Sequence, residues 1–360
     1  MLSNLWRRQA PQMVGIDIGS HEVKAILLGK VSDGYKILAH AAVPIKKGAV
    51  NDHDIRDSEA VIESLRLLKR QLPKSAKFAA VSVSGSAVMT KVIYMDASLN
   101  EVEMEAQIEI EADNLIPYSL DEVSIDFETL APNKNDATKV DVLLSACRTD
   151  NIDARVDALD DIGMEAKVVD VEGYALGRAY ELVAKQVPED IQQKGVVVLV
   201  DIGANMTTFA VVEQGETTFI REQAFGGELF TQSILSYYGM PYEQAEKAKI
   251  DGDLPRNYMF EVLSPFQTQL LQQIKRTLQI YCTSSNKDKV DYVLLCGGTS
   301  KLEGMVNLLT NELGVQAAIA DPFKGALKAD EKVQQQLQKD INKYLIACGL
   351  ALRSYGQWRT

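Results

Sequence analysis

Apolar residues in this chain gather into short runs, and one arrangement of these runs occurs twice. The first copy starts at Val14 and the second at Leu199, and in each an apolar run contains Asp-Ile-Gly and is followed, after a few polar residues, by a second apolar run. Apolar runs bounded by Gly predict buried strands joined by a hairpin turn. Such a turn lets backbone N–H groups come close to an anionic ligand. The repeat therefore predicts two lobes that hold a polyphosphate between them.

Elsewhere in the chain, predicted strands alternate with predicted helices. One helix has Ser58 as its N-cap and stops before Pro73, and another begins with a capping box of Asn100 and Glu103. The predicted strands cover residues 14–18, 23–28, 35–43, 78–83, 88–95, 123–130, 140–146, 166–170 and 290–296. The predicted helices cover residues 58–72, 101–115, 149–162, 173–187 and 260–283, one more begins at residues 300–301, and residues 188–194 form a polar linker. This alternation indicates an α/β protein with two similar lobes and an inserted module.

The order of these elements divides the chain into six segments. The core of the first lobe is expected in residues 11–83 and 167–194, and residues 84–166 are inserted between them as an α+β subdomain that binds a partner. The core of the second lobe is expected in residues 195–240 and 290–356, with residues 241–289 as a helical subdomain.

Composition excludes several classes of function. The 360 residues carry a formal net charge of −12, which argues against the clustered basic face that nucleic-acid binding needs. The four cysteines are far apart in sequence, which gives no zinc signature and suits reduced thiols in a cytoplasm. No apolar run reaches about eighteen residues, so no membrane-spanning helix is predicted.

Two well-known phosphate-binding patterns are missing from the sequence. The chain has neither the G-x-x-x-x-G-K-[ST] pattern of a P-loop nor a G-x-G-x-x-G after its first strand. Gly297 and Gly298 follow a predicted strand and are expected to open a helix, whose N-terminus would present backbone N–H groups. Alone, such a turn more often reflects tight packing than a ligand site.

Five separated segments, taken in order, resemble the actin-like ATPase superfamily, which includes actin, sugar kinases, FtsA and MreB. The resemblance implies a two-lobed α/β fold of the ribonuclease H-like type, with ATP and Mg²⁺ between the lobes. In the first phosphate loop it implies that Asp17 binds Mg²⁺ through water. It also implies that Gly19 and Ser20 hold the β-phosphate and that Lys24 approaches the terminal phosphates. Glu172, in the first connecting helix, would position the attacking water, or it is an ordinary acid at a helix N-terminus.

The same resemblance assigns the rest of the nucleotide site to the second lobe. The implied residues are Asp201, Gly203, Asn205 and Thr207 in the second phosphate loop, Gly226, Gly227, Glu246 and Lys249 near ribose and adenine, and Gly297, Gly298 and Thr299 in the adenosine motif. Asp201 is expected to be the second carboxylate beside the metal and, with Asp17 and Glu172, to serve catalysis. Asn205 occupies a position where the family often has Gly. Because Met206 follows it, Thr207 and Thr208 come one position later than the threonines of the bacterial D-x-G-G-G-T-T form. ATP binding with at most slow hydrolysis is therefore expected.

The inserted segment resembles the PilM family of type IV pilus assembly proteins. Residues 103–112, 126–128 and 349–353 carry this resemblance. It implies an FtsA-type subdomain in the first lobe, and as the main partner the cytoplasmic N-terminal peptide of the inner-membrane protein PilN. Other ATPases of the pilus machinery, its platform protein and self-association are further expectations. The nucleotide state would be coupled to pilus biogenesis and twitching motility.

The end of the chain bears on where such a protein would act. Unlike FtsA, the chain stops soon after its last predicted helix, and no C-terminal amphipathic membrane anchor is expected. A cytoplasmic protein of this kind would reach the inner membrane only through its partner.

Two other functions on the same fold stay open. A sugar or acid kinase needs an acceptor pocket with a catalytic base aimed at a hydroxyl, and the sequence has no further acidic residue in a recognisable acceptor motif. A filament-forming cytoskeletal ATPase would share every ATP-binding motif.

Overall fold

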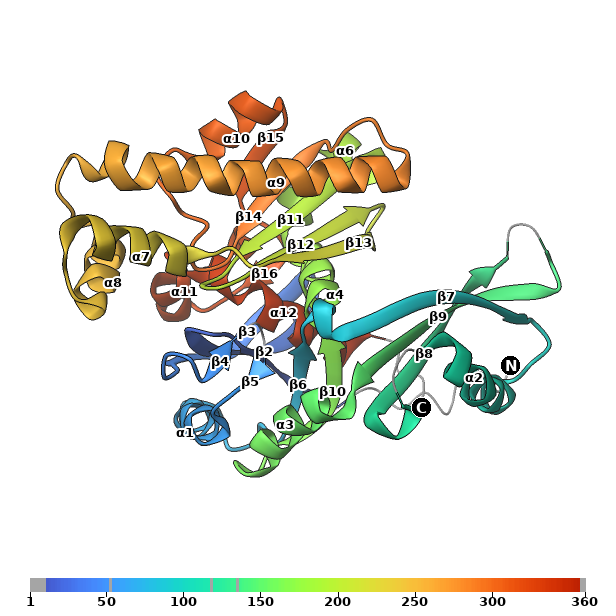
Figure 1. Cartoon of the computed structure of the whole chain (residues 1–360). Coiled ribbons are helices and arrows are strands. Elements are labelled where there is room, and N and C mark those ends of the chain that lie inside the picture. The colour runs from blue at the N-terminus through green and yellow to red at the C-terminus, as the bar shows by residue number, and fades with distance from the viewer. Residues whose placement is uncertain (1–10, 52–53, 117–118, 134–135, 357–360) are drawn as a thin grey trace.

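Two β-sheets form the centre of the protein, as the computed structural model of residues 11–51, 54–116, 119–133 and 136–356 shows (Figure 1). The first-lobe sheet has the strand order β10-β6-β1-β2-β3-β16 and the second-lobe sheet the order β13-β12-β11-β14-β15. The first sheet contains β1 (Val14–Ile18), β2 (Glu22–Val31), β3 (Gly34–Pro44), β6 (Phe78–Val83), β10 (Glu165–Val171) and β16 (Leu327–Lys328). The second contains β11 (Val196–Ile202), β12 (Thr207–Glu213), β13 (Glu216–Gln223), β14 (Tyr292–Cys296) and β15 (Gln316–Ile319).

Both predicted hairpins are present and hold equivalent places in the two sheets. β1 pairs antiparallel with β2, which places Asp17 opposite Lys24. β11 pairs antiparallel with β12, which places Asp201 opposite Thr208. Every residue of β1 and β11 is buried, as expected for central strands covered on both faces. The repeat in the sequence therefore marks the central hairpin of each lobe.

Helices cover the first-lobe sheet on both faces. On one face, Val61 of α1 and Leu159 of α3 join the core formed with Val14 and Ile16. On the other face, α4 and α12 lie between the two sheets and share a core with β11 and β14. The helices and short turns around this sheet are α1 (Ser58–Lys69), α3 (Thr149–Asp160), α4 (Glu172–Arg178), α5 (Tyr180–Val183), η3 (Ala184–Gln186), α11 (Glu331–Leu337), η6 (Ile341–Tyr344), α12 (Leu345–Ala351) and η7 (Leu352–Tyr355), with the small ribbon β4 (Val50–Asn51) and β5 (Asp54–Ile55).

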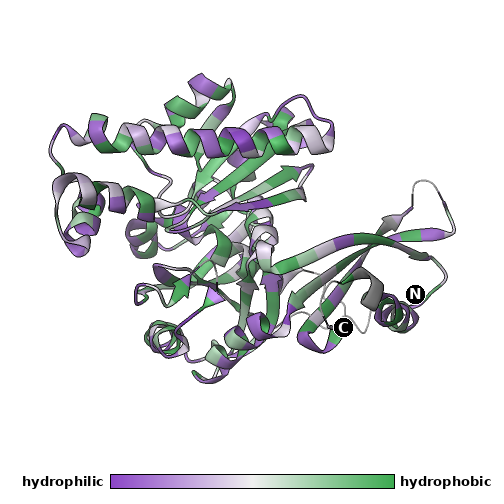
Figure 2. Ribbon diagram, in the orientation of Figure 1, coloured by the Kyte–Doolittle hydropathy of each residue, from purple (hydrophilic) through white to green (hydrophobic). Residues whose placement is uncertain are grey.

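A long helix, α9 (Ser264–Ser285), runs across the outer face of the second-lobe sheet (Figure 1). Its predicted apolar stripe is confirmed, since the buried residues are Phe266, Leu270, Ile274, Thr277, Leu278 and Tyr281. Figure 2 shows hydrophilic and hydrophobic residues alternating along this helix, as one-sided burial requires. The other helices of the lobe are α6 (Glu189–Lys194), α7 (Gly227–Tyr238), α8 (Tyr242–Asp251), the π-helical turn η4 (Met259–Leu263) and α10 (Met305–Leu313).

The inserted subdomain stands out from the core as an arm (Figure 1). Its antiparallel sheet has the order β7-β9-β8, and Met104 and Ile108 of α2 pack against Val142 and Leu144 of β9. The capping box of Asn100 and Glu103 is confirmed at the start of α2. The arm consists of η1 (Gly85–Ala87), β7 (Val88–Asp96), α2 (Glu101–Leu115), η2 (Leu120–Glu122), β8 (Val123–Pro132) and β9 (Lys139–Arg148). The helix that follows β9, α3, packs on the first-lobe sheet.

Some local predictions are wrong. Residues 188–194 were expected to be a linker, but α6 forms there, because two acids open its first turn and Lys194 closes it. The helix expected at residues 300–301 begins at Met305, after Gly304 with φ of +75°. The helix expected over residues 173–187 breaks into α4, α5 and η3.

The last strand, β16, pairs parallel with β3. The chain therefore returns from the second sheet to the first before α12. Within the described ranges, no helix is long and apolar enough to cross a membrane.

Candidate functional site

A cavity of about 470 Å³ lies between the lobes, bordered by the turns of both central hairpins. This volume is in the range of small-molecule and cofactor sites. Most of the predicted site residues line it, namely Asp17, Gly19, Ser20, Lys24, Glu172, Asp201, Gly203, Asn205, Glu246, Lys249, Gly298 and Thr299. The sequence predicted the order of these residues along the chain. The fold brings those from both halves of the chain together around one cavity.

Lys24 and Asp17 form an ion pair in the floor of this cavity, with 2.6 Å between Lys24 Nζ and Asp17 Oδ2. The pairing follows from the β1–β2 register, which places the two residues opposite each other. Burial lowers the pKa of Lys24, but the carboxylates of Asp17, Glu22 and Asp201 outweigh this effect and the net shift is upward. The ammonium group is therefore charged, and Lys24 lines the cavity beside its partner Asp17.

Asp201 is a buried carboxylate of the second lobe that lines the cavity. Its burial raises its pKa from 3.8 to about 7, with Lys24 opposing the shift and Asp17 and Glu172 adding to it. The Cys296 thiol donates a hydrogen bond to the same carboxylate. A buried carboxylate beside other carboxylates is a position that a cation would stabilise.

The two aspartates fit Mg²⁺ only in part. Mg²⁺ commonly takes one or two carboxylates and completes its shell with water and phosphate oxygens. In the part of the chain that the structure describes, no group of three or more His, Cys, Asp or Glu residues could hold a metal ion by itself. Asp17 and Asp201 would thus need water and a ligand's oxygen atoms to complete the shell.

Glu172 connects the two lobes at the back of the cavity. It is buried in the first turn of α4, and its Oε1 accepts a hydrogen bond of 3.0 Å from Thr208 Oγ1 of β12. Glu172 lines the cavity, as a residue that positions an attacking water must. It also lies at a helix N-terminus, as the alternative prediction of an ordinary acid at that position requires.

Four predicted site residues, Thr207, Gly226, Gly227 and Gly297, do not line the cavity. Thr207 is buried and donates its hydroxyl to the Phe225 carbonyl at 2.6 Å. A Cβ on Gly226 would lie 2.4 Å from the Ala204 carbonyl oxygen, so this Gly permits close packing behind the second phosphate loop. Because α10 begins only at Met305, the Gly297-Gly298 turn does not present a helix N-terminus, contrary to the prediction.

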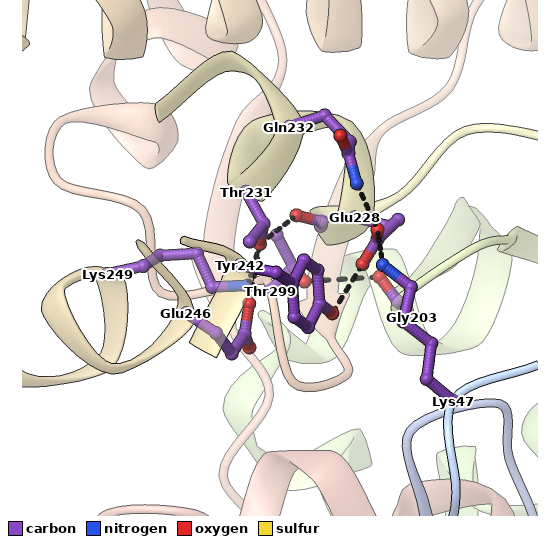
Figure 3. A network of polar contacts seen from close by, with 10 residues as sticks. Lys47, Gly203, Glu228, Thr231, Gln232, Tyr242, Glu246, Lys249 and Thr299 are labelled. Atoms are coloured by element: carbon purple, nitrogen blue, oxygen red, sulfur yellow. Dashed lines mark hydrogen bonds and ion pairs between the residues drawn. The ribbon is translucent and has the colours of Figure 1, made fainter. Parts of the chain in front are cut away.

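A polar network of second-lobe residues also borders the cavity (Figure 3). Lys249 Nζ lies 2.6 Å from Glu246 Oε2 and donates to Thr231 Oγ1 at 2.7 Å. Tyr242, which was not among the predicted site residues, donates its hydroxyl to Glu228 Oε2 at 2.7 Å. Tyr242, Glu246 and Lys249 are spaced i, i+4 and i+7 on α8, so helical periodicity could have grouped them.

Lys47 reaches this network from the first lobe (Figure 3). Its Nζ lies 2.7 Å from Glu228 Oε1 and 3.4 Å from the centroid of the Tyr242 ring. Burial raises the pKa of Glu228, but its bonds to Lys47, Gln232 and Tyr242 outweigh this and the net shift is downward. No local sequence pattern predicts this role of Lys47, because its partner Glu228 is 181 residues away in the chain.

Comparisons with known proteins agree with this fold. The family model described as type IV pilus assembly protein PilM matches residues 15–355. A solved PilM-PilN type IV pilus biogenesis complex is similar with a TM-score of 0.79 at 24% identity, over 96% of this chain and 99% of that chain. The ethanolamine utilization protein EutJ from Carboxydothermus hydrogenoformans is similar with a TM-score of 0.56 at 18% identity, over 96% of this chain and 91% of that chain. The predicted two-lobed actin-like fold is confirmed.

Proposed function

The chain belongs to the family of the type IV pilus assembly protein PilM, and from this premise we propose that it is an ATP-binding component of the type IV pilus assembly complex. The observation that carries the proposal is the buried cluster of Asp17, Lys24 and Asp201, which gathers charges from both lobes in a cavity of suitable size for a nucleotide.

We assign the phosphates to the hairpin end of the cavity. There, Lys24 and the turn at Gly19 and Ser20 would bind the β- and terminal phosphates, with Gly203 and Asn205 on the opposite side. Asp17 and Asp201 would hold Mg²⁺ through water, and the ion would neutralise phosphate charge. The nucleoside would lie beside Glu246, Lys249, Gly298 and Thr299, which line the same cavity.

We expect hydrolysis to be slow at most. The Gly19 amide donates to the Glu22 carbonyl at 3.2 Å and the Gly203 amide to the Met206 carbonyl at 2.9 Å, so both amides are engaged within their own turns before any phosphate arrives. Glu172 accepts from Thr208 and would have to share its carboxylate with an attacking water. Binding therefore has better support than turnover.

Titration calorimetry of ATP with Mg²⁺ tests the site. Lys24→Ala and Asp17→Ala should each weaken ATP binding by about tenfold or more, because each removes one member of a buried ion pair that faces the phosphates. Lys30→Ala is the matched control, since Lys30 is an exposed lysine on the same strand and should leave affinity unchanged. Equal affinities in all four proteins would refute the assignment.

The proposed partner is the cytoplasmic N-terminal peptide of PilN, whose affinity would depend on the nucleotide state. Other pilus ATPases, the platform protein and self-association are further parts of the proposal, as are a cytoplasmic position at the inner membrane and a role in twitching motility. Fluorescence anisotropy with a labelled PilN peptide, with and without ATP and Mg²⁺, tests the coupling. A peptide that binds no better than its scrambled control would contradict the proposed role.

A further inference from the structure

One contact joins the second lobe directly to the base of the inserted arm. Glu222 lies on β13, the edge strand of the second-lobe sheet, and its carboxylate meets the Ser84-Gly85-Ser86 turn where the arm begins. Glu222 Oε1 accepts from the Gly85 amide at 2.7 Å, and Oε2 accepts from the Ser86 amide at 3.2 Å. The Ser84 hydroxyl also donates to Oε2.

Several features make this contact a firm one. A carboxylate that accepts from two successive backbone amides and a hydroxyl forms charge-assisted bonds, which are stronger than neutral ones. Ser84 is buried, and a Cβ on Gly85 would lie 3.1 Å from Glu222 Oε1. The partners are 137 residues apart in the chain, so only the tertiary fold brings them together.

Glu222 is also connected to the cavity through the second-lobe sheet, two strands away from Asp201. In the register of β12 and β13, it is paired with Thr208, and Thr208 is paired with Asp201 on β11. The Thr208 hydroxyl is the group that donates to Glu172. Asp201, Thr208 and Glu222 thus form one row across three hydrogen-bonded strands, from the cavity to the edge of the sheet.

We propose that Glu222 is a positioning residue that fixes the inserted arm to the second lobe and passes movement of that lobe to the arm. The proposal rests on the proposed function in one respect, since it takes ATP to be the ligand that changes how the lobes close. A displacement of the second-lobe sheet would carry Glu222 with it and pull on the Ser84–Ser86 turn, the point from which β7 starts. The arm would then change its orientation with the nucleotide state.

The test compares Glu222→Ala and Glu222→Gln with Glu216→Ala, an exposed acid on the same strand. Amide exchange at Gly85 and Ser86 reports on the bonds themselves. Without nucleotide, we expect exchange there to rise about tenfold or more in Glu222→Ala, less in Glu222→Gln, which keeps one acceptor, and not at all in the control.

Orientation of the arm is read from the distance between spin labels at Lys91→Cys on β7 and Lys275→Cys on α9, in a Cys282→Ser background. With ATP and Mg²⁺, the distance distribution should shift in the parent protein and in Glu216→Ala. In Glu222→Ala it should be broad and should no longer respond. ATP affinity, measured by calorimetry on the same samples, should stay within about twofold of the parent.

The outcomes separate the two proposals. If the parent binds no ATP, the proposed function fails, and the exchange rates without nucleotide still decide on the contact. If Gly85 and Ser86 stay as protected in Glu222→Ala as in the parent, the positioning role is wrong. If the variant binds ATP and its label distance shifts as in the parent, the transmission of movement is wrong.

Discussion

At the scale of single residues, the burial of Asp201 makes the stability of the nucleotide-free protein depend on pH. In an unfolded chain this carboxyl would titrate near 3.8, whereas its pKa in the folded protein is about 7. Between these values the folded state keeps a proton that the unfolded state has lost, so the free energy of unfolding falls as pH rises through this range. Above about pH 7 the carboxyl is ionised in both states, and the loss of stability caused by burying the charged Asp201 stays constant.

Asp201→Asn removes this titration. Its stability gain over the parent should be larger at pH 8 than at pH 5.5 by roughly 2 kcal/mol, because one pKa unit corresponds to about 1.4 kcal/mol. Urea denaturation in EDTA without nucleotide measures the difference. The same gain at both pH values would show that the carboxylate carries no such penalty in the folded protein.

At the scale of elements, the contact between helices α4 and α12 depends on one glycine, Gly349. A Cβ on Gly349 of α12 would lie 1.8 Å from the Ala175 carbonyl oxygen of α4. Any side chain there must push the helices apart, and these helices carry the core between the sheets, including Leu176 and Leu350.

Gly349→Ala should therefore lower the free energy of unfolding by roughly 3 kcal/mol, at the upper end of the usual cost of overpacking. Gly356→Ala is a suitable control, because its nearest atom would be 3.9 Å away. Thermal denaturation of both variants measures the effect. Equal melting temperatures for Gly349→Ala and the parent would mean that the helices can separate at little cost.

The elements also show what the sequence could and could not predict. The central hairpins and the buried stripe of α9 were predictable, because a strand or helix with buried positions has apolar residues in a characteristic run or spacing along the sequence. The pairing of β16 with β3 was not, since a two-residue strand is too short for such a run or spacing. Thr207 was expected at the cavity from its place in a motif, but the strand alternation turns its hydroxyl toward Phe225.

Residues of the site were predictable to the degree that they belong to local motifs. Asp17, Lys24 and Asp201 lie in the repeated hairpins, and all three line the cavity. Glu228 and Lys47 meet across 181 residues, and the choice of partner depends on how the lobes close. Information of that kind is in the tertiary arrangement and not in any short segment.

At the scale of the whole molecule, Lys47 makes a polar contact from one lobe to the other. It is an exposed side chain of the first lobe, and both groups it meets, Glu228 and Tyr242, belong to the second. An exposed ion pair contributes up to about 1 kcal/mol and a cation–π contact a similar amount. Together they can change the equilibrium between closed and open lobes several-fold.

Lys47→Ala should therefore speed the release of a bound nucleotide by roughly three- to tenfold, because opening no longer breaks these contacts. Stopped-flow displacement of a fluorescent ATP analogue measures the rate. Lys46→Ala is the matched control, since its neighbour Lys46 pairs with Asp57 within the first lobe and should leave the rate unchanged. The difference between the two variants should shrink at high salt, which screens the ion pair. If Lys46→Ala and Lys47→Ala release nucleotide at the same rate, the lobes are held closed by other contacts, and the first candidate is then the buried bond between Thr208 and Glu172.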